Sequence, residues 1–197
     1  MVLLVLLTGV RTLACYSGLA IIPTVDLVAH GKYGLEVQFD GGLAAGTVDT
    51  QLVNTQFGLS PRFEAGVDFD LSGGPGSRSL FNAKWLLLKE PAVAIGVCNV
   101  CSGLRSSPYA VATRPLGPMR FHLGCIGLDG AGRWFAGVDR AATSQLTLMA
   151  DYTSGPDNAA SVGLAHQFTE HLGVLAAIIF PNTTGSEMGF TLHLTLN

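Results

Sequence analysis

The stretch from Gln51 to Ser72 alternates apolar and polar side chains on both sides of a proline turn. A period of two is the pattern of a β-strand with one apolar and one polar face. Pro61 fixes its own φ and donates no backbone hydrogen bond, which suits the bend between two such strands. The stretch therefore predicts a β-hairpin.

The same pattern recurs to the end of the chain and predicts about twelve strands. They cover residues 33–40, 51–59, 63–71, 80–88, 92–97, 109–114, 119–127, 133–139, 145–152, 159–168, 172–180 and 187–197. Most are close to the roughly 9–11 residues that a tilted strand needs to cross a bilayer.

The connectors between these strands are of two alternating kinds. Those at 59–62, 89–91, 115–118, 141–144 and 169–171 are tight, whereas those at 41–47, 73–79, 99–108, 129–132, 153–158 and 181–186 are richer in Gly, Ser, Pro and Asn. An even number of strands, with short turns at one end and looser loops at the other, is typical of an outer-membrane barrel. The predicted fold is therefore an all-β, antiparallel, up-and-down transmembrane β-barrel.

The composition indicates either a very large core or an outer face that does not meet water. Hydrophobic residues make up 48% of the chain and charged residues only 13%, against about 25% charged in an average soluble domain. The formal net charge is -3, with no block of like charges. Nucleic-acid partners are disfavoured, because binding them requires a basic patch.

The N-terminal part differs from the barrel pattern. Residues 1–14 combine a short apolar run with small residues before Cys15 and predict a secretory signal peptide cut after Ala14; a lipoprotein site at Cys15 is the alternative. Residues 15–31 form a lead-in that packs on or inside the fold, and a periplasmic lead-in segment is the preferred assignment. Residues 32–197 are the β-barrel domain.

The polar face of the strands supplies the candidate binding residues. In a membrane barrel the apolar face turns to lipid and the polar face lines the lumen, whereas a soluble barrel is built the other way round. The predicted lumen-lining residues are Glu36, Asp40, Glu64, Asp68, Asp70, Lys84, Arg114, Arg120, His122, Asp139, Asp151 and His193.

Catalytic and metal chemistry find little support in these residues. No G-x-S-x-G nucleophile motif occurs, although His122 and His193 on the polar face leave a lipid hydrolase open. Asp68 and Asp70 could bind a cation together with Glu64, but solvated lumen charge is the preferred interpretation. Cys98 and Cys101 form a lone C-x-x-C, so a disulfide or a structural role is expected rather than a zinc site. We predict no catalytic residue, no metal and no cofactor.

Residues 17–41, SGLAIIPTVDLVAHGKYGLEVQFDG, carry a resemblance to a known family. A Gly-Leu, an apolar pair and Pro-Thr, followed by a glycine, resemble the start of YjbH-like outer-membrane β-barrel proteins, which are associated with exopolysaccharide production. The resemblance implies a structural motif and carries over no catalytic residue. One departure is the end of the chain at Asn197, where many outer-membrane barrels have an aromatic residue.

We therefore predict a bacterial outer-membrane β-barrel of structural or passive transport type, linked to exopolysaccharide export. Its expected partners are outer-membrane lipid, the barrel-assembly machinery, and polysaccharide or small solutes. A secreted soluble β-barrel that binds an apolar ligand and a barrel enzyme acting on outer-membrane lipid are the alternatives.

Overall fold

The computed structural model describes residues 17–197 except 45, 73–77 and 102–104. The twelve strands are β1 (Tyr33–Gly42), β2 (Thr47–Ser60), β3 (Phe63–Asp70), β4 (Arg78–Lys89), β5 (Ala92–Val100), β6 (Ser107–Leu116), β7 (Met119–Leu128), β8 (Ala131–Ala141), β9 (Leu146–Thr153), β10 (Ala159–Gln167), β11 (Leu172–Pro181) and β12 (Gly189–Leu196). None of the described residues form a helix of the length and apolarity needed to cross a bilayer. The predicted signal peptide and Cys15 lie outside the described residues.

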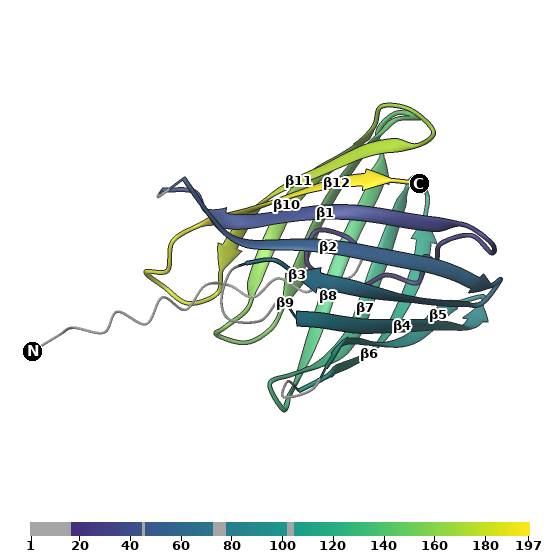
Figure 1. Ribbon diagram of the computed structural model, residues 1–197, viewed down its shortest axis with the longest axis horizontal. Coiled ribbons are helices and arrows are strands. Elements are labelled where there is room, and N and C mark those ends of the chain that lie inside the picture. The colour runs from purple at the N-terminus through teal and green to yellow at the C-terminus, as the bar shows by residue number, and fades with distance from the viewer. Residues whose placement is uncertain (1–16, 45, 73–77, 102–104) are drawn as a thin grey trace, which may run out of the picture.

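The strands close into a single antiparallel barrel (Figure 1). Each strand pairs with its neighbours in the chain, and β1 pairs with β12 to complete the ring. Val37 on β1, for example, lies opposite Val53 on β2 and Leu194 on β12. Since every strand has two partners, the sheet has no open edge. The predicted twelve-stranded, antiparallel up-and-down barrel is confirmed.

The connectors sort to two ends of the barrel, as the sequence predicts. The connections β2–β3, β4–β5, β6–β7, β8–β9 and β10–β11 lie at one end, here called the short-turn end, together with the C-terminus. The other connections lie at the loop end. One of these is tighter than expected, because β7 and β8 are joined by Asp129 and Gly130 alone. Both residues have positive φ (49° and 85°), as a two-residue hairpin turn of the I′ type requires.

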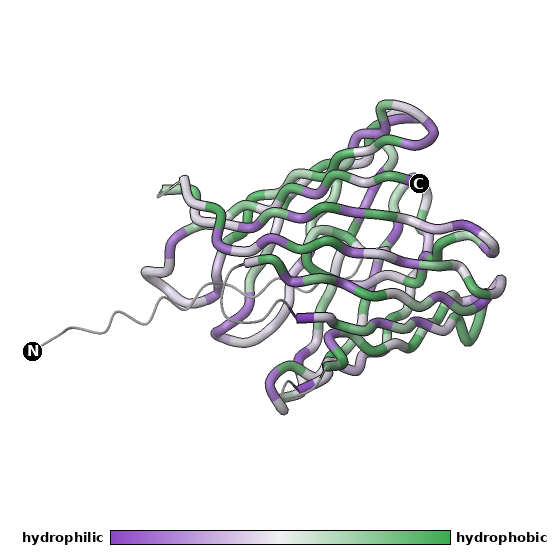
Figure 2. The backbone as a smooth tube through the Cα atoms, in the orientation of Figure 1, coloured by the Kyte–Doolittle hydropathy of each residue, from purple (hydrophilic) through white to green (hydrophobic). Residues whose placement is uncertain are grey.

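The two faces of the sheet have opposite polarity. On β3, the side chains of Glu64 and Asp68 are buried, each 1% exposed, whereas Phe69 between Asp68 and Asp70 is 41% exposed. The hydropathy alternates in the same way along many strands (Figure 2). Large hydrophobic residues on the outside include Phe57, Phe81, Trp85, Ile95, Phe121, Leu123, Trp134, Leu148, Val162, Leu164, Ile178 and Leu194. The barrel is therefore apolar outside and carries buried charge inside.

Residues 17–31, here called the inner segment, occupy the interior (purple in Figure 1). Leu19 to Val25 are all buried, and the segment bonds to inward-facing side chains of β3, β4, β7 and β9. It meets the wall at the short-turn end, where the Gly31 amide donates to the Gly58 carbonyl (2.8 Å) and the Gly58 amide to the Lys32 carbonyl (3.0 Å). Of the two placements left open by the sequence, on the fold or inside it, the structure shows the second.

The interior is only partly polar, which differs from the sequence-based expectation. A buried apolar cluster joins Leu19, Ile21, Ile22 and Val25 of the inner segment to wall residues. The larger wall residues in it are Tyr109, Val111, Ile126, Phe135, Met149 and Ile179. The difference arises because the inner segment brings its own apolar side chains, which need apolar partners on the wall.

Candidate functional site in the barrel interior

Most of the predicted lumen-lining residues lie inside the barrel. Nine of them are buried: Glu36, Asp40, Glu64, Asp68, Lys84, His122, Asp139, Asp151 and His193. Arg120 and Asp70 are half-buried, Arg120 near the short-turn end and Asp70 at the loop end of β3. Their role in binding a solute stays a prediction.

Arg114 is the exception, and its predicted place in the lumen is wrong. On β6 the buried residues are Ser107, Tyr109, Val111 and Thr113, so residue 114 has the opposite parity and is exposed. A strand turns successive side chains to opposite faces. The sequence misled because the inward positions of β6 are Tyr109, Val111 and Thr113, so that its charged residue near the short-turn end falls on the outer face.

Lys84 and Glu64 fix the inner segment near the short-turn end. Their side chains form an ion pair (Nζ to Oε1, 3.2 Å) in which both are almost fully buried. The Lys84 ammonium also donates to the backbone carbonyls of Ser17 (2.9 Å) and Asp26 (2.7 Å). Glu64 accepts from the Val28 amide (2.6 Å) and from the Ser17 hydroxyl. A buried charge pair of this kind is tolerated only when further hydrogen bonds satisfy both partners, and here the inner segment provides them.

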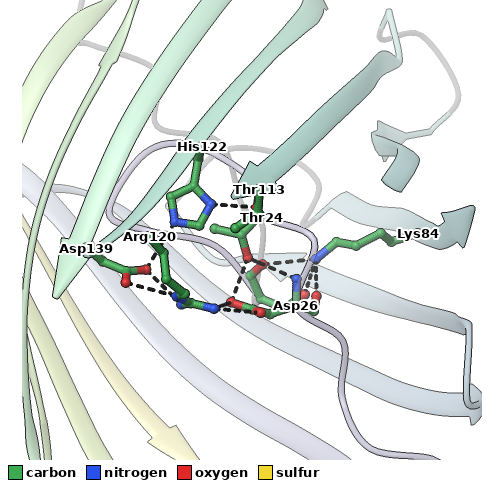
Figure 3. A network of polar contacts seen from close by, with 8 residues as sticks. Thr24, Asp26, Lys84, Thr113, Arg120, His122 and Asp139 are labelled. Atoms are coloured by element: carbon green, nitrogen blue, oxygen red, sulfur yellow. Dashed lines mark hydrogen bonds and ion pairs between the residues drawn. The ribbon is translucent and has the colours of Figure 1, made fainter. Parts of the chain in front are cut away.

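A second ion-pair group ties Asp26 to the opposite wall (Figure 3). The Arg120 guanidinium lies 2.9 Å from both carboxylate oxygens of Asp26, and it donates to Asp139 through Nε (2.9 Å) and Nη2 (2.7 Å). Asp139 also meets Nε2 of His122 at 3.1 Å, and Nδ1 of His122 lies 2.8 Å from the Thr113 hydroxyl. Arg120 and Asp26 are about half exposed, whereas Asp139 and His122 are buried.

The far end of the inner segment is held mainly by apolar contact. It turns back on itself, with the Leu19 amide donating to the Ile22 carbonyl (2.9 Å), and the Ile21 amide donates to Asp151 (3.1 Å). Here the wall residue is Gly137, where a Cβ atom would lie 2.6 Å from Cδ1 of Ile22 and 2.8 Å from Cδ1 of Leu19. Glycine at 137 is therefore what lets the segment approach the wall.

A cavity of about 430 Å³ remains beside the inner segment at the short-turn end, here called the vestibule. Its described lining includes Gly18 and Leu19 of the segment and the polar residues Glu36, Ser144, Gln145, Thr147, Gln167, His193 and Thr195. At its wall, Glu36 lies 3.2 Å from Nδ1 of His193 and accepts from the Asn54 amide group (2.7 Å). The vestibule is thus an amide- and hydroxyl-lined recess with one carboxylate–imidazole pair.

Both histidines that left a hydrolase open sit in a hydroxyl–imidazole–carboxylate chain. Thr191 bonds to Nε2 of His193 (2.7 Å), which pairs with Glu36, and Thr113 bonds to His122, which pairs with Asp139. The order of groups is that of an activated nucleophile. However, Thr113 is only 5% exposed and Thr191 only 1% exposed, so no substrate carbonyl reaches either oxygen in this arrangement.

In the part of the chain that the structure describes, no group of three or more His, Cys, Asp or Glu side chains could hold a metal ion. Of the C-x-x-C pair, Cys98 is buried and Cys101 is half-buried. Whether the two form a disulfide stays a prediction.

Sequence reasoning missed the residues that the inner segment contributes, above all Ser17 and Asp26. The signal that could have found Asp26 is its position in an otherwise apolar stretch, SGLAIIPTVDLV, because a lone carboxylate there needs a basic partner. Ser17 carries no such signal.

The fold resembles that of known porins. A structure described as the KdgM porin in complex with disordered oligogalacturonate matches with a TM-score of 0.65 at 8% sequence identity, over 83% of this chain and 98% of that chain. A structure of the NanC porin matches with a TM-score of 0.54 at 11% identity, over 84% of this chain and 100% of that chain. No family model and no curated protein matches the sequence. At such identities the likeness concerns the fold.

Proposed function

We propose that this protein is a bacterial outer-membrane β-barrel of the passive channel type, held closed by its inner segment. The single observation that carries the proposal is the inverted polarity of the wall. Leu123 is 63% exposed and Val162 is 58% exposed on the outside, whereas Asp68 and Glu64 are buried inside. Water would penalise that outer face, but the hydrocarbon of a bilayer does not.

Exposed aromatic residues support the same assignment. Tyr33, Phe57, Trp85 and Phe168 lie toward the short-turn end of their strands, and Phe69, Phe81, Trp134 and Phe180 lie toward the loop end. Two such belts are the arrangement expected where a barrel wall meets the two lipid–water interfaces. The likeness of the fold to porins agrees with this proposal.

Passage through this barrel requires the inner segment to move. Residues 19–25 are buried within the barrel, and Lys84 and Arg120 of the wall bond to the segment itself. We infer that the protein conducts small solutes only when the segment leaves its place, and that its resting conductance is low. A purely structural barrel would keep the segment in place under all conditions.

A charge on the outer face tests the membrane assignment. We expect Leu123→Arg to lower the free energy of unfolding in lipid by about 2–4 kcal/mol, because Leu123 lies near the middle of β7. The measurement is urea unfolding of the reconstituted protein, with Thr184→Arg in an exposed connector as the matched control. If Leu123→Arg left stability unchanged and the protein fractionated with soluble proteins, the proposal would fail.

The soluble alternative makes the opposite prediction for the same variant. A secreted barrel that binds an apolar ligand would be soluble without detergent, and an arginine on its outside would improve its solubility. The enzyme alternative rests on the two histidine chains. It would be supported only if His122→Ala and His193→Ala abolished a lipid-modifying activity of the wild-type protein.

The proposal extends to partners that follow from the location. An outer-membrane barrel contacts outer-membrane lipid and is inserted by the barrel-assembly machinery. The YjbH-like affiliation and a link to exopolysaccharide export are the finer form of the proposal. They predict that a strain lacking this protein secretes less exopolysaccharide. Normal secretion by that strain would contradict the proposed link to exopolysaccharide export.

A further inference from the structure

Carboxyl groups outnumber basic side chains inside the barrel. Among the described residues, the buried carboxyl and basic side chains comprise six carboxyl groups, one lysine and two histidines that pair with Asp139 and Glu36: Glu36, Asp40, Glu64, Asp68, Asp139, Asp151, Lys84, His122 and His193. The half-buried Arg120 and Arg133 add two guanidinium groups, Arg133 at the loop end of β8. The interior thus presents more acidic than basic groups to anything that enters it.

The basic groups near the inner segment are already committed to carboxylates. Lys84 pairs with Glu64 (3.2 Å), and Arg120 pairs with Asp139 (2.7 Å). Asp68 and Asp151, by contrast, receive hydrogen bonds from neutral groups, the amide of Asn82 on Asp68 and the Ser161 hydroxyl with the Ile21 amide on Asp151. Neither of these two carboxyl groups therefore has a lysine or arginine as a direct partner among the described residues.

Two oxygen atoms in this part of the interior lack any hydrogen-bond donor. Asn54 and Asp68 lie opposite each other on β2 and β3, and both side chains are at least nine-tenths buried on the inward face. Oδ1 of Asn54 and Oδ1 of Asp68 have no hydrogen-bond partner among the described residues. Both atoms are acceptors, so a cation or a group rich in N–H donors would satisfy them, whereas an anion would not.

The vestibule has the same character. Its described lining contains Glu36 but neither lysine nor arginine. The Glu36 carboxylate accepts a hydrogen bond from the amide group of Asn54 (2.7 Å), which connects the vestibule wall to the donor-free oxygens buried behind it. An anionic solute at this mouth would meet a carboxylate whose basic neighbour, His193, is already paired with it (3.2 Å).

We propose that the interior is selective for cations, and that its solutes are inorganic cations or small molecules bearing ammonium groups rather than anionic sugars. The binding surface is the part of the wall formed by Glu36, Asn54 and Asp68. Asp151, which bonds to the inner segment, adds a further carboxyl group. The inferred passage of cations rests on the proposed channel function, whereas the inferred binding of cations does not. An acidic, partly enclosed passage concentrates cations and excludes anions.

Binding to the full-length protein in detergent is the first test. Putrescine, an organic diammonium, is expected to raise the melting temperature, and oligogalacturonate is expected not to. The melting temperature in a potassium chloride series separates the effect of an inorganic cation from that of an organic one. Asp68→Asn, which retains the shape of the side chain, is expected to lose most of the putrescine shift. Glu36→Gln is the second variant, should Asp68→Asn fail to fold, and Asp157→Asn in an exposed connector is the control.

Ion selectivity in planar bilayers is the second test. In a potassium chloride gradient the reversal potential is expected to give a cation-to-anion permeability ratio of about ten, reduced toward one in Asp68→Asn. A barrel that conducts without this preference, or prefers anions, would overturn the inference while leaving the proposed channel intact. A barrel that never conducts but binds putrescine would remove the channel and leave the cation site. Equal shifts with oligogalacturonate and putrescine would overturn the inference in either case.

Discussion

The inner segment is held at two places by different kinds of interaction. Toward the short-turn end, Asp26 and the backbone near it are bound by charged groups, through Lys84 and Arg120. Deeper in the barrel, Leu19 and Ile22 pack against Gly137. We call these two places the polar anchor and the apolar anchor.

The difference between the two anchors indicates how the inner segment can be held firmly and still leave the barrel interior. The polar anchor contains an ion pair, Arg120–Asp26, that is about half exposed to solvent and is therefore weakened by salt. The apolar anchor depends on close packing, which tolerates little change in volume. The polar anchor is thus the contact that salt weakens, whereas the apolar anchor depends on packing, which salt does not screen.

The largest effect on conductance is expected from Gly137→Val, which breaks the apolar anchor. The added Cβ alone would lie 2.6 Å from Cδ1 of Ile22, far inside contact distance. Overpacking of this kind costs about 1–3 kcal/mol, and 1.4 kcal/mol is a factor of ten in the closed-to-open ratio, so the conductance in planar bilayers should rise by about five-fold to about a hundred-fold.

The matched control for this variant lies on the same strand. Gly132→Val places its side chain where no atom lies within 4 Å, and it should leave conductance at the wild-type value. Equal conductance in the two variants would show that Leu19 and Ile22 do not close the barrel.

In the buried part of the polar anchor, the expected effect is on the free energy of unfolding rather than on conductance. Lys84→Met leaves the Glu64 charge buried without its cation, since Glu64 is only 1% exposed. Breaking a buried pair in this way costs about 3–5 kcal/mol in the free energy of unfolding. Urea unfolding measures it, and the double variant Lys84→Met with Glu64→Gln should recover much of the loss. A double variant as unstable as the single one would mean that the ion pair is not the cause.

The smallest effect is expected from Asp26→Asn at the exposed part of the polar anchor. The Arg120–Asp26 pair is 41% and 46% exposed, so its loss should cost only about 0.2–1 kcal/mol, and less at high salt. Comparing channel opening in low and high salt checks this. Glu170→Gln, which removes a pair on an exposed turn, should change nothing, and an equal response in both variants would deny Asp26 a role in closure.

Much of the fold follows from periodicity. The hairpin at Pro61, the twelve strands and the Asp129–Gly130 turn are local patterns, and alternation alone assigns Phe69 and Asp68 to opposite faces. Arg114 shows the limit of this argument. Its strand places Tyr109 and Val111 inside, so assigning all polar residues to the lumen puts residue 114 on the wrong face. Parity must be read from the pairing of neighbouring strands rather than from polarity.

The contacts across the interior could not be predicted in this way. Lys84 and Ser17 are far apart in the chain, as are Arg120 and Asp26, and no local pattern connects them. Such pairs form only once the barrel has closed and brought opposite walls around the same segment.

By itself, the sequence determined the strands, their number and the division of their side chains between an apolar and a polar face, because backbone geometry alternates side chains regardless of what surrounds them. Only the tertiary structure decided what fills the barrel. The inner segment is too short for its sequence pattern to predict its partners. Burial of its apolar and charged side chains is favourable only where Gly137 leaves space and where Lys84 and Arg120 supply charge. Burial of that segment depends on the closed wall, and the closed wall is a property of the whole chain.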